Sequence, residues 1–161
     1  GNLSLTYNYQ LHAASSFNDS SSQLTLDLDF GTVFLGDAVA DLGFSIYNGA
    51  GDRVGLNLDT VSGNGSTAQL TTDLSPFSAL AAGSSYDFLA SLNTSAIGAY
   101  NATYTLNFSD EDVGASSSRF NNYQMTLNLR GTVEQRIPEP GVLTLLGIGL
   151  LGLRFAQRKR A

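Results

Sequence analysis

The feature that most constrains the fold is a strict alternation of apolar and polar residues along most of the chain. In the segment 100–108, YNATYTLNF, apolar residues take the even positions and Asn or Thr the odd ones. Because successive side chains of a β-strand point to opposite faces, this spacing predicts a strand with one buried and one wet face. The same alternation, in places weaker, occurs in the segments 3–11, 24–30, 42–48, 54–60, 67–72, 86–92 and 123–129.

These eight segments are separated by residues typical of turns, such as Asn48-Gly49 and Ala82-Gly83. Outside the C-terminal tail, the one candidate helical turn is 76–83, PFSALAAG, which could instead be a crossover. Short antiparallel strands with one wet face must stack as two sheets or close as a barrel. We therefore expect an all-β fold over residues 1–133, an immunoglobulin-like β-sandwich of about eight antiparallel strands.

Charge and composition exclude several classes of function. Up to residue 137 the chain carries 13 acids and four arginines, a net charge of −9, which repels phosphate backbones and argues against nucleic-acid binding. With no cysteine, disulfides, thiol nucleophiles and zinc fingers are excluded. The one histidine, His12, has no serine or carboxylate placed beside it by a known motif, so we expect a loop or strand-end residue.

The C-terminal tail differs from everything before it. A linker, 134–140, with two prolines leads into 13 uncharged, mainly apolar residues, 141–153, and the tail then ends with a basic cluster. As a helix these 13 residues span ~20 Å, against a hydrocarbon core of ~30 Å. Because basic residues after an apolar run hold that end in the cytoplasm, residues 141–161 predict a hydrophobic helix and basic tail, with 141–156 crossing a membrane temporarily.

Pro138, Glu139 and Pro140, the apolar stretch, and Arg158, Lys159 and Arg160 resemble the PEP-CTERM sorting signal in their order. The resemblance implies a protein exported by a Gram-negative bacterium that makes exopolysaccharide. It implies exosortase as a partner, recognition through the Pro138–Pro140 triplet, and a cytoplasmic basic stop at Arg158–Arg160. The location would be the inner membrane during sorting, then the cell surface or extracellular matrix. The alternative is a periplasmic domain permanently anchored by this tail.

The body carries a second resemblance. The segment LDFGTVFLGDAVADLGFSIYN, 28–48, and the later TLNLRGTV, 126–133, place glycines at strand ends, at Gly31, Gly36 and Gly131. They are similar to Hydin-like immunoglobulin folds and choice-of-anchor domains, over roughly 23–133. Such domains are mostly scaffolds or adhesion modules, so the resemblance implies a structural or adhesive role without catalysis.

Two groups of carboxylates are candidate sites. Asp110, Glu111 and Asp112 precede the last strand and could bind Ca²⁺, or form a solvated acidic loop. Asp27 and Asp29 share one strand face about 7 Å apart at Cα, a spacing compatible with a glycosidase pair, but that face is predicted to be solvated. We expect no cofactor and a non-enzymatic protein; a Ca²⁺- or polysaccharide-binding module is the alternative.

Overall fold

The computed structural model describes residues 3–4, 6, 9–114, 120–121, 123–137, 141, 145–146 and 148. This part of the chain is all-β, as the alternation predicted. Its strands are β1 (Ser15–Ser16), β2 (Thr25–Phe34), β3 (Leu42–Asn48), β4 (Leu56–Gly65), β5 (Leu70–Thr72), β6 (Phe77–Leu80), β7 (Ser85–Leu92), β8 (Gly98–Asp110) and β9 (Tyr123–Glu134).

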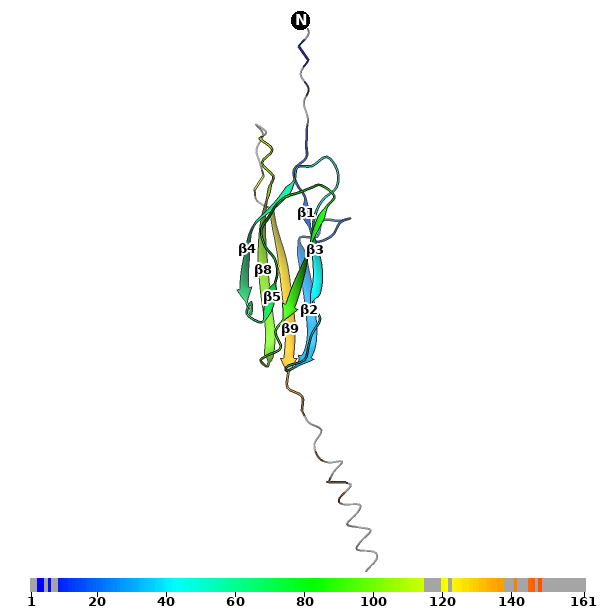
Figure 1. The fold of residues 1–161 in the computed structure, drawn as a ribbon, viewed down its shortest axis with the longest axis vertical. Coiled ribbons are helices and arrows are strands. Elements are labelled where there is room, and N and C mark those ends of the chain that lie inside the picture. The colour runs from blue at the N-terminus through cyan, green and yellow to red at the C-terminus, as the bar shows by residue number, and fades with distance from the viewer. Residues whose placement is uncertain are drawn as a thin grey trace, which may run out of the picture.

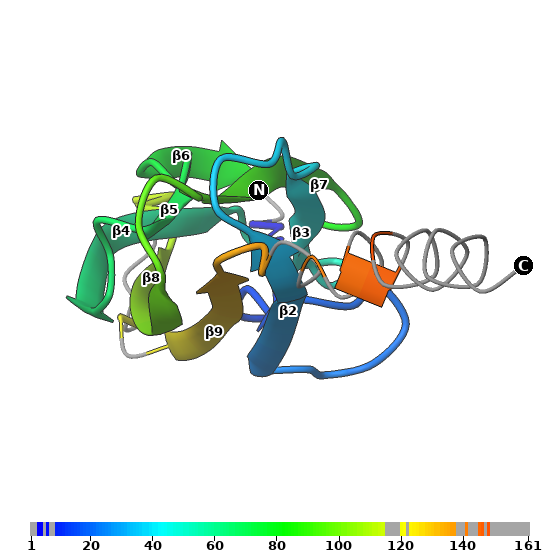
Figure 2. The same cartoon turned by 90° about the horizontal axis from the view of Figure 1, so that it is seen from below.

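The strands form two sheets, which we call the two-sheet body (Figures 1 and 2). One has the order β1-β3-β7-β5 and the other the order β2-β9-β8-β4-β6. The body has two ends. At the exit end β2 and β9 finish and β8 begins, since Gly98 is paired with Val133. At the opposite, far end β8 finishes, where Asp110 is paired with Leu56.

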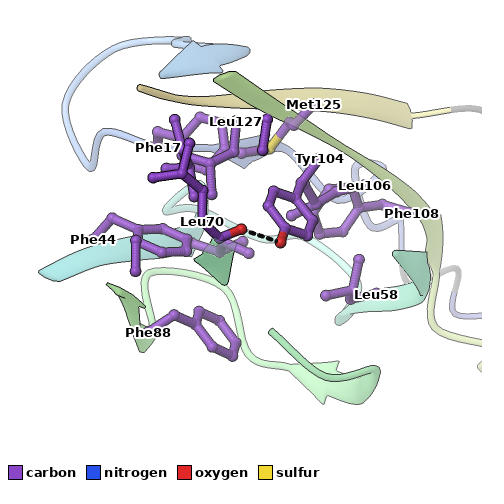
Figure 3. Close-up of a cluster of buried hydrophobic side chains, with 14 of the residues drawn as sticks. Phe17, Phe44, Leu58, Leu70, Phe88, Tyr104, Leu106, Phe108, Met125 and Leu127 are labelled. Carbon is purple, nitrogen blue, oxygen red and sulfur yellow. Dashed lines mark hydrogen bonds between the residues drawn. The ribbon is translucent and has the colours of Figure 1, made fainter. Parts of the chain in front are cut away.

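The core lies between the sheets (Figure 3). Phe44 of β3 and Phe88 of β7 face apolar side chains of the five-stranded sheet. Those side chains alternate along their strands with exposed or half-buried polar residues, which is why the two-residue period could be read from the sequence. The buried members from the five-stranded sheet include Leu56, Leu58, Ala102, Tyr104, Leu106, Phe108, Met125, Leu127, Leu129 and Val133.

One strand pair corrects the expected antiparallel order. β2 and β9 run parallel, with Thr25 paired with Thr126 and Phe34 paired with Glu134. The register shifts between Asp29 and Thr32, where Gly31 takes a φ of 70°, a conformation that favours glycine. Alternation reports which face of a strand is buried but not its direction, so the sequence pattern could not reveal the parallel pair.

Two segments were predicted wrongly. The described residues of 3–11 lie outside any strand: Leu3 and Tyr9 are largely exposed, and Leu11 makes an isolated bridge to Arg53. The segment 76–83 contains the strand β6 in place of a helical turn, because Leu80 pairs with Leu56 and is buried.

The predicted C-terminal helix falls largely outside the described residues. Of the segment 141–161, Leu145, Leu146 and Ile148 are described as helical, and the Leu145 amide donates to the Gly141 carbonyl at 2.6 Å. Among the described residues no helix has the length and apolar character needed to cross a membrane.

A hydrogen bond inside the core joins the two sheets. The Tyr104 hydroxyl on β8 donates to the carbonyl of Leu70 on β5 at 2.6 Å (Figure 3). Burial raises the pKa of Tyr104, so the phenol stays a neutral donor. Since β5 is an edge strand, this contact satisfies a buried carbonyl at the border of the four-stranded sheet.

We expect Tyr104→Phe to lower the free energy of unfolding by about 1–3 kcal/mol, because it leaves the Leu70 carbonyl buried without this donor. Urea unfolding at neutral pH measures the change. Tyr100→Phe is the matched control: its hydroxyl donates to the exposed Ala96 carbonyl, so the change should stay within about 0.5 kcal/mol. Equal losses in both variants would contradict this role of the buried bond.

Candidate functional site

Asp110 is the one buried carboxylate among the described residues, and it organises the far end of the body. It is the last residue of β8 and is 3% exposed, not part of a solvated loop as expected. Its Oδ1 accepts hydrogen bonds from the Ala13 amide at 2.9 Å and the Tyr123 hydroxyl at 3.2 Å. Its Oδ2 accepts from His12 Nδ1 at 2.6 Å and the Phe120 amide at 2.9 Å.

These contacts determine how Asp110 titrates. Desolvation alone would raise the pKa of Asp110, but the hydrogen bonds from His12, Phe120, Ala13 and Tyr123 outweigh it and hold that pKa below its usual value. Burial, together with the charge and hydrogen bond of Asp110, raises the pKa of Tyr123. The pair is therefore an ionised carboxylate with a neutral phenol donor at neutral pH.

The two acids that follow Asp110 do not join it in a cluster. Glu111 is held by its backbone amide, which donates to the Gly55 carbonyl at 2.7 Å, and Asp112 caps its own turn by accepting from the Gly114 amide at 3.0 Å. In the described part of the chain no group of three or more potential ligands is placed to hold a metal ion. Both Asp110 oxygens point at protein donors, so calcium binding by Asp110, Glu111 and Asp112 stays a prediction with little geometric support.

His12 and Asp110 form a pair that the sequence did not reveal, although a signal was present. The two residues are 98 positions apart, and no motif connects them. Continuing the alternation of segment 100–108 by one step, however, places Asp110 on the inward face. A carboxylate at an inward strand position needs charged or polar partners, and the chain's one histidine was the natural candidate.

The outer face of the five-stranded sheet carries the other candidate pair. Asp27 and Asp29 both project outward, as expected for a solvated face, and each has a partner on β9. The Asn128 side chain donates through Nδ2 to Asp27 Oδ1 at 2.8 Å, and its Oδ1 accepts a hydrogen bond from the Thr103 hydroxyl. Arg130 Nε lies 3.0 Å from Asp29 Oδ2. The two carboxylates thus belong to a ladder of polar side chains across β2, β9 and β8.

Two adjoining shallow hollows lie on this polar face, with volumes of about 270 and 260 Å³. Asn101 and Arg130 line both of them. Amide, hydroxyl, carboxylate and guanidinium groups can all bond to sugar hydroxyls, so the face has the chemistry of a polar ligand surface. The other lining residues include Asp27, Asp29, Tyr100, Thr103, Asn128 and Thr132.

At the exit end the chain is fastened just as it leaves β9. The Leu35 amide donates to the Glu134 carbonyl at 2.8 Å. Arg136 Nη2 donates to both carboxylate oxygens of Asp37, at 3.0 and 2.9 Å, and its guanidinium carbon lies 4.9 Å from the centre of the Phe34 ring. We call this arrangement the Arg136 clamp. It fixes the chain two residues before Pro138.

Comparison with known families finds a match to the PEP-CTERM protein-sorting motif over residues 136–160. The motif therefore begins at the clamp residue itself. It supports secretion and targeting by exosortase, and it implies export with membrane-associated sorting. No curated protein matches the chain. Pro138, Glu139 and Pro140, like Arg158, Lys159 and Arg160, lie outside the described residues.

We expect Asp110→Asn to lower the free energy of unfolding by about 3 kcal/mol at pH 7, because an amide cannot accept all of these hydrogen bonds. Since folding lowers the pKa of Asp110, its stabilisation is present above the unfolded value of about 3.9 and is lost as pH falls through the folded value. Urea unfolding of both proteins between neutral and acid pH should show the difference shrinking below about pH 4.

Asp112→Asn is the matched control, because Asp112 is exposed and Asn can still accept from the Gly114 amide. Its effect should stay within about 0.5 kcal/mol at every pH. A pH-independent loss in Asp110→Asn would show that packing, not the ionised carboxylate, stabilises the far end.

Proposed function

We propose that the chain is an exported, non-catalytic structural or adhesive component of the cell surface or exopolysaccharide matrix of a Gram-negative bacterium. The observation that carries this proposal is the sorting motif at 136–160, which starts directly beyond β9. In this proposal the two-sheet body is an immunoglobulin-type sandwich of the choice-of-anchor or Hydin-like kind. Exosortase releases the body from the inner membrane, and the body then acts through its surface.

The contacts of Asp110, Asp27 and Asp29 favour a structural over a catalytic role for these three carboxylates. A carboxylate that acts as a general base or nucleophile needs an acceptor oxygen aimed at a substrate. The Asp110 carboxylate instead faces His12, Tyr123 and backbone amides. Asp27 and Asp29 face Asn128 and Arg130. These contacts stabilise the fold, which is compatible with a structural or adhesive domain.

A second candidate function is polysaccharide binding by the body itself. The two adjoining hollows over β2, β9 and β8 favour it, because their lining groups can exchange hydrogen bonds with sugar hydroxyls. An extended saccharide could run from one hollow to the next across Asn101 and Arg130. A body permanently anchored in the periplasm by an uncleaved tail is the alternative to release.

The mass of the mature C-terminus tests sorting. In the native host we expect the matrix or surface fraction to contain protein that has lost the segment after the Pro138–Pro140 region. Glu139→Ala should reduce this processing and retain the chain in the membrane fraction. The matched control is Glu134→Ala, an acid just outside the matched motif, which should leave processing unchanged. An intact tail ending at Ala161, found in membranes alone, would instead establish the permanently anchored domain.

Affinity electrophoresis in gels containing the host's exopolysaccharide tests the second candidate. We expect the polysaccharide to slow the protein, and Arg130→Ala with Asn101→Ala to restore its mobility. Asp87→Ala, on the four-stranded sheet, is the control: relative to a gel without polysaccharide, it should be slowed as much as the unaltered protein is. Mobility that does not depend on the polysaccharide would dismiss this function.

A further inference from the structure

Exposed apolar side chains gather at the exit end of the body. Phe34, Leu35, Ile97 and Ile137 are between 40% and 87% exposed. Scattered apolar residues are normal on a protein surface, but these four surround one point, the place where the chain leaves β9. Figure 2 is viewed from below, toward this end, and shows β2 and β9 side by side with the chain continuing beyond β9.

Strand register brings the four residues together from separate parts of the chain. Phe34 pairs with Glu134, and Leu35 donates its amide to the Glu134 carbonyl. Ile97 directly precedes Gly98, which pairs with Val133. The same β9 residues therefore have the Phe34–Leu35 corner on one side and Ile97 on the other. Ile137 follows three residues after β9 ends.

The tether between this end and the apolar tail is short. Arg136, held by Asp37 and Phe34, is five positions before Gly141, and a fully extended chain covers at most about 18 Å in five steps. The headgroup layer on one side of a bilayer accounts for roughly 5–8 Å of that distance. With the tail in the membrane, the exit end must face the lipid surface at close range.

Charge does not favour contact between the body and the membrane, so a favourable contact has to come from the apolar side chains. Up to residue 137 the chain has a net charge of −9, which anionic lipids repel. Next to the tether, the Arg136 cation is already paired with Asp37. Leucine, isoleucine and phenylalanine side chains instead favour the boundary between headgroups and acyl chains.

We propose that the exit end is a membrane-docking surface, on which Leu35 and Ile97 contact the outer leaflet of the inner membrane while the tail is embedded. This inference rests on the proposed membrane-associated sorting. It adds that the body stands on the bilayer with its strands pointing away from it. The docked body would hold Arg136, the first residue of the sorting motif, close to the membrane surface, where a membrane enzyme acts.

The chain contains no tryptophan, so a single introduced one reports its own surroundings. The full chain is reconstituted into phosphatidylcholine vesicles, with or without lipid brominated near the headgroup end of the acyl chains. Leu35→Trp should show a blue-shifted emission and lose intensity when brominated lipid is present. Ile97→Trp should behave in the same way, which guards against a variant that fails to fold.

Two further variants serve as references. Val113 lies just beyond the end of β8 at the far end of the body. The 13 residues of β8 separate it from the exit end by roughly 40 Å. Val113 is at least as exposed as Leu35, so Val113→Trp is a matched reference. It should not be quenched. Ile148→Trp, within the apolar tail, should be quenched whenever the tail is embedded.

The outcomes separate the two proposals. If Ile148→Trp is quenched but Leu35→Trp and Ile97→Trp match Val113→Trp, docking is refuted and membrane sorting stands. If Ile148→Trp is not quenched, the membrane step fails and docking fails with it. Quenching of Val113→Trp would mean that the body lies flat on the bilayer, which contradicts an upright body docked by its exit end. An emission change in Leu35→Trp that requires exosortase in the vesicles would identify the enzyme, not lipid, as the partner.

Discussion

The parallel pairing of β2 with β9 determines how the rest of the molecule is arranged. Eight residue pairs join the two strands, and β9 is joined to β8 on its other side by eleven more. Because β2 and β9 run in the same direction, both finish at one end of the body. That coincidence places Phe34 and Asp37 beside Arg136, so that the first residue of the sorting motif is fastened to the fold.

The opposite end depends on one buried charge. Asp110 gathers the segment at His12 and Ala13, the backbone at Phe120 and the start of β9 at Tyr123. The chain has no cysteine, so no disulfide can hold these segments together. A single carboxylate can do so, because it accepts hydrogen bonds from several donors at once. The body is therefore held together at the far end by a buried carboxylate and between its sheets by the hydrophobic core.

Alternation of apolar and polar residues predicted the interior strands well. The strand predicted at 42–48 has the bounds of β3, and the segments 100–108 and 123–129 lie within β8 and β9. The pattern failed where strand pairing, not burial, decides the structure. Segment 3–11 alternates as clearly as β8 does, but its described residues have no strand beside them, whereas β6 forms because β4 offers an edge.

The candidate sites were harder to predict because they depend on contacts between distant residues. His12 is 98 residues from Asp110, and Asp37 is 99 residues from Arg136. The sorting motif, by contrast, is defined by local order and composition, and it could be identified from 25 letters without any structure.

The path of the chain has a mechanical consequence. Leu11 meets the body at the far end, and the chain leaves beyond Glu134 at the exit end (Figure 1). A force applied between these two points acts along β9, so the ladders to β2 and β8 are loaded in shear, all their hydrogen bonds sharing the pull. A force across the strands would instead open the bonds one after another. We expect single-molecule pulling along the first direction to need the larger force.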